Sequence, residues 1–301
     1  MSWAIDQTDN QVVRVKVEIP TSVRGWEQWV LLRSDAHHDN PACNRELEKK
    51  HLEQCKERNG MWIDNGDLFC AMQGKQDKRS AKSALDMIHK GSNYLDLLVE
   101  EAAKFYGPYA KHCVLLGQGN HESSILNRYE TCLTERLAQT LHNDTGHKVI
   151  NGGYTTWIKF DFKCGGRRGS ALLWRMHGYG GGGPVTMDMI QKNRQEAYAG
   201  QADIMFSGHT HDQWTSNNPV LYVSPMGHLT QRKRTYVKCP TYKDEYKDGR
   251  GGWHVETGKP PKTVGAYWLR FYVPTGGTTR KTEKNRRTKR LIDWQIIEAE
   301  H

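Results

Sequence analysis

Five short polar segments of the chain carry side chains that divalent metals bind. They are Asp35-Ala36-His37, Gly66-Asp67, Gly119-Asn120-His121-Glu122, Met176-His177-Gly178 and Gly208-His209-Thr210-His211. Their carboxylate, amide and imidazole groups form the mixture of oxygen and nitrogen donors that Mn²⁺, Fe²⁺ and Zn²⁺ accept. Two such ions a few ångströms apart are a common catalyst of phosphate-ester hydrolysis. The segments therefore indicate a metal-dependent hydrolase of phosphate esters.

Each polar segment directly follows a short apolar run, and these runs are residues 29–32, 61–63, 113–116, 171–174 and 204–206. Runs of this length, rich in β-branched and aromatic residues and closed by Gly or Asn, predict buried strands. The stretches 81–105 and 124–141 predict helices between them. In an α/β domain, ligands bind at the carboxyl ends of the strands, so we expect the five segments to converge there.

The ordered motifs D-x-H, GD, GNHE, H and GHTH, between residues 35 and 211, closely resemble the calcineurin-like metallophosphoesterase superfamily. The resemblance implies a four-layer α-β-β-α sandwich of two mixed sheets and a centre of two metal ions. Mn²⁺ is the expected ion, with Fe, Zn or Ni as alternatives. By the same resemblance, one metal would be held by Asp35, His37 and His211, the other by Asn120, His177 and His209, and Asp67 would bridge the two.

The resemblance also implies a mechanism, in which a hydroxide shared by the two metals attacks phosphorus. His121 resembles the second-sphere histidine of the superfamily and is expected to protonate the leaving oxygen. Glu122 is expected to cap the following helix, the alternative being that it orients His121. His38 and Asp39 are expected to be bystanders.

One position departs from the pattern of the superfamily. Cys70 stands where many members have a second Asp or Asn, three residues after the aspartate of the GD motif. We expect this change to alter the hydrogen bonds around the metals rather than metal binding itself. It leaves the metal preference open.

Basic residues are concentrated near the end of the chain. Residues 231–290 contain 17 Lys or Arg against 5 Asp or Glu, although the net charge of the whole chain is only +9. Such clusters, here 232–234 and 280–290, can neutralise a phosphate backbone, so nucleic acid is the expected partner and substrate. Arg286 and Arg287 are candidate substrate-binding residues. The alternative is that 275–290 is a solvated basic arm without a specific ligand.

Changes in composition along the sequence suggest three parts: a catalytic core at 1–230, an irregular basic and aromatic insertion at 231–263, and strands at 264–301 that return to the core, with a basic loop or arm at 275–290. Strands are expected at 264–273 and 291–297. The insertion is expected to cover the metal cleft and to present Trp253, Tyr242 or Tyr246 to a nucleic-acid base, unless these rings simply pack against the sheet. The glycines of 178–183 would admit a bulky phosphodiester, or connect flexibly to a helix starting near Pro184.

Several classes of protein are disfavoured. No apolar stretch approaches the ~20 residues that cross a bilayer, and the first ten residues lack the features of a secretory signal. Seven cysteines without paired short spacing favour reduced thiols and a cytoplasmic location. No phosphate-binding P-loop pattern is present.

We therefore expect a nuclease or phosphodiesterase acting on nucleic acid. Residues 66–69, GDLF, resemble the repair-exonuclease branch of the superfamily, and the whole chain looks similar to its compact bacteriophage members. A phosphomonoesterase acting on phosphoprotein or small nucleotides is the alternative, and a catalytically silent binding protein is a third possibility. The oligomeric state stays open.

Overall fold

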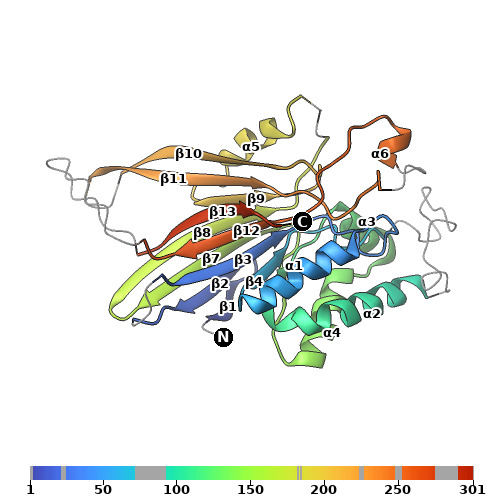
Figure 1. The fold of residues 1–301 in the computed structure, drawn as a ribbon, viewed down its shortest axis with the longest axis horizontal. Coiled ribbons are helices and arrows are strands. Elements are labelled where there is room, and N and C mark those ends of the chain that lie inside the picture. The colour runs from blue at the N-terminus through green and yellow to red at the C-terminus, as the bar shows by residue number, and fades with distance from the viewer. Residues whose placement is uncertain are drawn as a thin grey trace.

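Two packed β-sheets with helices outside them make up the protein (Figure 1). The computed structural model describes residues 3–21, 25–71, 93–181, 183, 185–223, 227–247, 253–274 and 291–300. Among them, one sheet has seven strands, in the order β1 (Trp3–Asp9), β2 (Val12–Glu18), β7 (Thr155–Cys164), β8 (Arg167–Met176), β9 (Ile204–Ser207), β11 (Leu229–Lys238) and β10 (Trp214–Val223). The other has six, in the order β13 (Asp293–Glu298), β12 (Tyr267–Tyr272), β3 (Glu27–Arg33), β4 (Met61–Asp64), β5 (Cys113–Leu116) and β6 (Ile150–Asn151).

Both sheets are mixed, and their parallel parts position the polar segments. β3, β4, β5 and β6 run parallel to one another, and β9 runs parallel to both β8 and β11. The remaining pairs include the antiparallel hairpins β1–β2, β7–β8 and β10–β11. Because parallel strands end at the same edge, the loops after β3, β4 and β5 start side by side, and so do those after β8 and β9.

The main hydrophobic core lies between the two sheets. Along β2, Val13, Val15 and Val17 are buried and alternate with more exposed residues, as expected for a strand with one covered face. The ring of Phe271 from the six-stranded sheet packs 4.9 Å from that of Phe160 in the seven-stranded sheet, measured between centroids. This contact joins the two sheets at the centre of the sandwich.

The outer layers are unequal. On the six-stranded sheet, a second core is formed with α1 (Arg45–Glu57), α2 (Tyr94–Tyr106), the 3₁₀ helix η3 (Gly107–His112) and α4 (Leu133–Thr145). On the seven-stranded sheet, the helix α5 (Met189–Glu196) leads to Ala199 and Ala202, which pack against Trp174, Met205 and Tyr236. The α/β sandwich of two mixed sheets predicted from the sequence is confirmed. None of the described helices is long and apolar enough to cross a membrane.

The predicted strands are confirmed, whereas two helix predictions need correction. The stretch 124–141 is not one helix but parts of two, α3 (Asn120–Tyr129) and α4, because Glu130 has a left-handed φ of 53° that ends α3. The helix expected near Pro184 begins only at Met189, since Met187 and Asp188 also have positive φ. α2 covers the last part of 81–105, and residues 72–92 lie outside the described residues.

The expectation of an irregular insertion from residue 231 is wrong for its first eight residues. They belong to the ten-residue strand β11, which pairs with β9 on one side and with β10 on the other. The basic side chains that suggested a loop are used within the fold: Lys233 contacts Asp293, Arg234 donates to the carbonyl of Ala202, and Lys238 pairs with Asp188. Beyond β11 the described chain is mostly irregular, with the short helix α6 (Trp253–Glu256). β12 and β13 then rejoin the six-stranded sheet as expected.

Candidate metal centre

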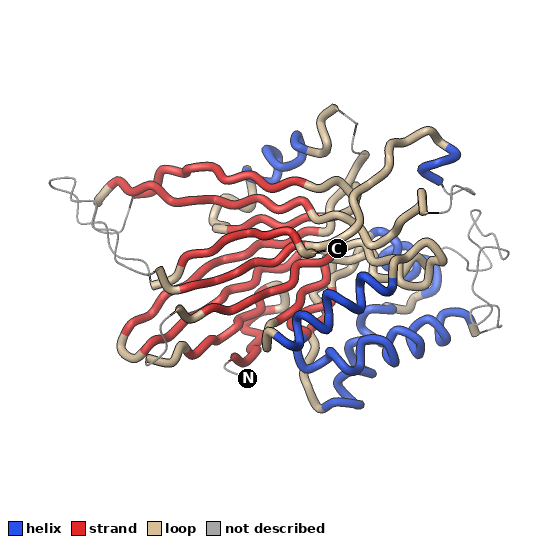
Figure 2. Tube along the Cα trace, viewed as in Figure 1, coloured by secondary structure: helices blue, strands red, loops and turns tan. Residues whose placement is uncertain are grey.

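Many loops that follow the strands gather at one end of the sandwich (Figure 2), and the five polar segments are among the loops that follow strands. Backbone hydrogen bonds join them directly. The amide of Asp35 donates to the carbonyl of Gly66, and that of His37 donates to the carbonyl of Asp67. Across the sandwich, the amide of His209 donates to the Asp35 carboxylate at 2.9 Å. The convergence predicted from the sequence is therefore present in the structure.

The backbone is strained at most of the predicted ligands. Positive φ values, which are uncommon for residues other than glycine, occur at five of the seven ligands: Asp35 (53°), His37 (46°), Asp67 (52°), His209 (76°) and His211 (59°). Each such residue costs of order ~1–3 kcal/mol and persists only where the surrounding structure enforces it. A concentration of this kind marks a functional site rather than a region built for stability.

The glycines of two motifs provide the space that the carboxylates occupy. A Cβ atom at Gly119 would overlap the carboxylate of Asp67, and one at Gly208 would overlap the side chains of Ser34 and Asp35. A side chain at either position would displace a carboxylate. The glycine of GNHE and that of GHTH are thus required by the packing of the site.

The first predicted metal position brings together three potential ligand atoms. The Nε2 atoms of His37 and His211 are 3.3 Å apart, and His211 Nε2 lies 3.4 Å from Asp35 Oδ1. Asp35 Oδ1 and His37 Nδ1 are buried and have no hydrogen-bond partner within the described part of the chain. Buried polar atoms are rarely left unpaired. The unpaired carboxylate oxygen suits a metal ion bound at this position.

The second predicted position is equally close-packed. Asn120 Oδ1 lies 2.7 Å from His209 Nδ1 and 3.2 Å from His177 Nε2. The carboxylate of Asp67 joins this group through Oδ2, which is 3.2 Å from His177 Nε2. The other ring nitrogen of His177 lies 3.1 Å from the carbonyl of Asn65, an arrangement that commonly orients a metal-binding histidine.

The charges of the site favour a cation. Burial disfavours ionised carboxylates, but His177 and His211 lower the pKa of Asp35, and His177 and His121 lower that of Asp67. In return, Asp67 and Asp35 overcome the effect of burial and raise the pKa of His177 to about 9. Burial lowers the pKa of His37, which is thereby neutral and able to bind a metal. Without a metal, the positive charge of protonated His177 offsets the negative charges of Asp35 and Asp67.

His121 lies at the edge of this group. Its Nδ1 atom is 2.6 Å from the carbonyl oxygen of Cys70, its backbone amide donates to Asp67 Oδ1, and its Nε2 atom lies 3.8 Å from Asp67 Oδ2. Burial acts against the charged ring, but Asp67 and the Cys70 carbonyl raise the pKa of His121 to about 10. The ring therefore carries a proton at neutral pH and holds it next to the predicted bridging ligand.

Glu122 caps α3, as expected, and also joins two motifs. Its carboxylate accepts hydrogen bonds from the amides of Gly119 (2.8 Å), Asp67 (3.0 Å) and Phe69 (2.9 Å). Burial and the nearby Asp67 charge raise the pKa of Glu122 to about 8. The residue thus fixes the GD loop against the GNHE loop.

The two expected bystanders have structural roles. Asp39 accepts hydrogen bonds from the amides of Cys70 and Ala71, and so holds the loop that leads away from Asp67. His38 turns away from the metal centre and contacts Glu48 at 3.0 Å. Neither residue belongs to the clusters of predicted metal ligands, in line with the expectation that they are bystanders to the metals, but both support the surrounding structure.

Sequence reasoning also missed two supports of the centre. Asn65, besides contacting His177, accepts a hydrogen bond from Arg175 at 2.8 Å, and Arg175 in turn donates to the carbonyls of Gly153 and Tyr154. These contacts join the ends of the two sheets beneath the site. The only signal in the sequence is the position of Asn65 directly before the GD motif.

The described part of the structure does not place the predicted substrate-binding residues at the metal centre. Trp253 is the first residue of α6, and Arg286 and Arg287 lie outside the described residues. Tyr242 cannot stack on a base, since it is fully buried and its hydroxyl contacts His51 at 2.8 Å. Tyr246 is partly exposed, and its hydroxyl donates to the carbonyl of Lys259.

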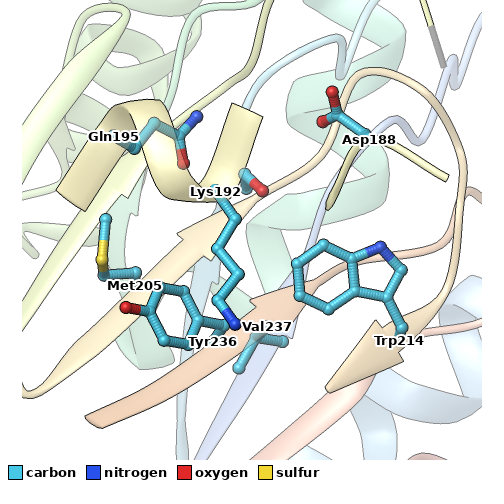
Figure 3. Close-up of a pocket in the computed structure, with 8 residues that line it drawn as sticks. Asp188, Lys192, Gln195, Met205, Trp214, Tyr236 and Val237 are labelled. Atoms are coloured by element: carbon cyan, nitrogen blue, oxygen red, sulfur yellow. The ribbon is translucent and has the colours of Figure 1, made fainter. Parts of the chain in front are cut away.

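A separate small pocket lies between α5 and the seven-stranded sheet (Figure 3). Lys192 extends into it, with its ammonium 4.0 Å from the centroid of the Tyr236 ring, and Trp214 lies on the other side (Figure 3). The carboxylate of Asp188 is paired with the buried Lys238. Among the described residues that line this pocket there is no cluster of metal ligands, and its acid, Asp188, already has a cation.

No protein-family model and no curated protein sequence matches the chain. Similar solved structures include a conserved uncharacterized protein of Streptococcus pneumoniae, a predicted phosphoesterase, at 10% identity and a TM-score of 0.30, covering 83% of this chain and 84% of the other. Vps29 of Entamoeba histolytica, complexed with zinc, aligns at 10% identity and a TM-score of 0.35, covering 90% of this chain and 99% of Vps29. GAP50, the anchor in the inner membrane complex of Plasmodium, aligns at 10% identity and a TM-score of 0.37, covering 91% of this chain and 90% of GAP50. With TM-scores this low, these similarities support no conclusion about function.

Proposed function

We propose that the protein is a metal-dependent phosphoesterase of the calcineurin-like metallophosphoesterase superfamily, hydrolysing phosphodiester bonds in nucleic acid. The observation that carries the proposal is the convergence of Asp35 and Asp67, both buried, with four histidines and Asn120 at one end of the sandwich. Within the described residues no Lys or Arg forms an ion pair with either carboxylate. Buried charges are normally paired or bind metals.

The residues divide naturally into two ligand groups. Asp35, His37 and His211 would hold one ion, and Asn120, His177 and His209 the other, with Asp67 shared between them. When bound, the two ions would supply Lewis acidity and lower the pKa of a water molecule so that it can attack phosphorus at neutral pH. Mn²⁺ suits this mixture of oxygen and nitrogen ligands, as do Fe, Zn and Ni.

His121 supplies the proton in this proposal. Its Nδ1 faces the Cys70 carbonyl and its Nε2 faces the site, so the proton on Nε2 is the one available to a leaving oxygen. Because Asp67 raises the pKa of the ring, the proton is present at neutral pH. Donation of that proton would favour departure of the alkoxide that hydrolysis releases.

The choice of nucleic acid rests on charge. The excess of Lys and Arg over residues 231–290 supports an anionic polymer as substrate, although Lys233, Arg234 and Lys238 are already used in contacts within the protein. Of the cationic side chains that remain, many belong to 280–290, and Arg286 and Arg287 are our candidates for contacting phosphates. A cytoplasmic enzyme with access to nucleic acid would fit these properties.

A substrate panel tests the proposal. Mn²⁺-loaded protein is incubated with end-labelled single- and double-stranded DNA and RNA, an aryl phosphodiester and an aryl phosphomonoester. Cleavage of a polynucleotide by wild type, lost in Asp67→Asn and kept in the surface control Asp96→Asn, is the expected result. Hydrolysis of the monoester alone would favour the phosphomonoesterase, and equal rates for wild type and Asp67→Asn would refute the site.

A further inference from the structure

Cys70 is held in a fixed position beside the metal centre by contacts from three directions. Its amide donates to Asp39, its carbonyl oxygen lies 2.6 Å from His121 Nδ1, and the side-chain amide of Asn40 donates to its sulfur at 3.4 Å. The residue is 4% exposed. Nothing in the proposed hydrolysis uses the thiol.

Two imidazoles face this sulfur. The Cys70 Sγ atom and one ring nitrogen from each of His37 and His121 lie within 4.8 Å of one another. His121 Nδ1 is occupied by the Cys70 carbonyl, which leaves Nε2 available to bind. His37 is 2% exposed, with Nε2 facing His211 and Nδ1 lacking a hydrogen-bond partner among the described residues. The His37 ring therefore offers a buried nitrogen that has no partner among the described residues, in addition to the thiol of Cys70.

We propose that Cys70, His37 and His121 form an additional metal position that takes a thiophilic divalent ion such as Zn²⁺ or Cd²⁺. Zinc binds thiolate sulfur and imidazole nitrogen in a tetrahedral arrangement, whereas Mn²⁺ and Mg²⁺ prefer oxygen-rich sites. On binding, the ion forms bonds to the Cys70 sulfur and to one nitrogen of each imidazole, while the thiol proton and the extra proton that His121 carries at neutral pH are released to water. The hydrogen bond from Asn40 stabilises the resulting thiolate.

A second cysteine cluster differs from the Cys70 cluster in containing its own cation. Cys43, His38 and Glu48 also bring three potential ligand atoms together. There, however, Glu48 forms an ion pair with Arg33 at 2.6 Å, so the group already contains its cation. No Lys or Arg ion-pairs with the Cys70 cluster within the described chain.

Occupation of this position would inhibit the enzyme, and that consequence rests on the proposed function. An ion bound to His121 would remove the proposed proton donor. It would also place a second cation on the His37 ring, whose Nε2 faces the first catalytic position, and so oppose binding of the first catalytic ion. The centre would thus distinguish oxygen-preferring ions, which support hydrolysis, from sulfur-preferring ions, which block it.

Cadmium titration of the Mn²⁺-loaded full-length protein tests the inference without any turnover. A cadmium–thiolate bond produces an ultraviolet charge-transfer absorption, which wild type should develop with one equivalent of bound ion. Cys70→Ser should lose this absorption and weaken that binding step by at least the roughly 10- to 100-fold that is lost when a residue that merely supports a ligand is changed. Cys164→Ser, which changes a partly exposed cysteine at the end of β7, should behave as wild type.

Two results would overturn the proposal: no thiolate absorption in wild type, or the same absorption in Cys70→Ser. Protection from alkylation gives an independent readout that needs no variant. Cadmium should shield Cys70 from iodoacetamide in partly unfolding buffer, as mapped by mass spectrometry, and equal labelling of Cys70 with and without cadmium would also contradict it. Thiolate binding without phosphoester hydrolysis would leave this inference standing and refute only the proposed function.

Discussion

Two groups of buried carboxylates lie near the same strand ends and differ in what neutralises them. Glu48 and Asp64 are both ion-paired with Arg33, at 2.6 and 2.9 Å. Asp35 and Asp67 contact imidazoles instead, at 3.4 Å from His211 and 3.2 Å from His177. The first group includes a permanent cation, whereas the second depends on protons that metal ions can replace. A buried acid therefore indicates a metal here only where the chain provides no guanidinium or ammonium for it.

Breaking the second group should have the largest effect on activity. We expect His177→Ala to lower kcat/KM on an aryl phosphodiester about 10³-fold. The change removes a predicted metal ligand and the imidazole that offsets the negative charge of Asp67. The matched control is His112→Ala, which removes another buried histidine that contacts the Gly60 carbonyl and lies outside the metal clusters. Comparable losses in the two variants would mean that any buried histidine matters equally.

Breaking the first group should mainly cost stability. Arg33→Met leaves Glu48 and Asp64 buried without their cation, so we expect the free energy of unfolding to fall by about 3–5 kcal/mol. Arg136→Met, which breaks the exposed pair with Asp96, should cost less than ~1 kcal/mol. Urea denaturation of both variants measures the difference. If Arg33→Met were as stable as Arg136→Met, the contrast between buried and exposed pairs would be lost.

The two groups should also respond differently to pH. In the metal-free protein the pKa of His177 is raised from 6.5 to about 9. The charged ring therefore stabilises the fold fully below pH 6.5, and this contribution is lost as pH rises through about 9. This contribution of the charged ring to the free energy of unfolding should amount to roughly 3 kcal/mol.

Thermal melts of chelator-treated and Mn²⁺-loaded protein over this pH range test that expectation. The metal-free protein should lose stability as pH rises, and bound metal, which replaces the proton, should remove most of the loss. Metal affinity should rise over the same range. Parallel curves for the two forms would show that His177 does not exchange a proton for a metal.

Glu122 is a third kind of buried acid, with no cation beside it in the described chain: three backbone amides donate to its side chain, and burial raises its pKa to about 8. Glu122→Gln keeps one acceptor oxygen but turns a side-chain NH₂ group towards backbone amides that are themselves donors. The lost hydrogen bonds should loosen the GD loop. We expect metal affinity to fall by about 10- to 100-fold, as for other residues that support ligands. Gln191→Glu, a partly exposed change on α5, is the matched control, and calorimetric titration with Mn²⁺ measures both. An unchanged affinity in Glu122→Gln would restrict the residue to helix capping.

The sequence was sufficient to predict the strands and to select the residues that converge at the centre. This worked because buried strands ending in Asp, Asn or His leave a local signature, and because parallel strands must end together. Asp39 and Asn65 could not be recognised in this way. Their roles depend on hydrogen bonds to residues such as Cys70 and Arg175, which only the folded chain brings near.

Basic composition was the least reliable guide. Residues 231–238 looked like part of a surface insertion, yet they form β11, where Lys238 is fully buried against Asp188. Charge counts do not distinguish a cation that faces solvent from one that neutralises a buried acid. The break between α3 and α4 was missed for a similar reason, since the left-handed conformation of Glu130 has no strong sequence signal.

We propose that Asp35, Asp67 and their histidines bind two divalent ions. The most direct test is metal content, measured by mass spectrometry after Mn²⁺-loaded wild type, Asp67→Asn and Asp96→Asn are dialysed against metal-free buffer. We predict two ions per chain in wild type and Asp96→Asn, and a marked loss in Asp67→Asn, which lacks the shared carboxylate. Equal metal content in wild type and Asp67→Asn, or no retained metal in wild type, would contradict the account.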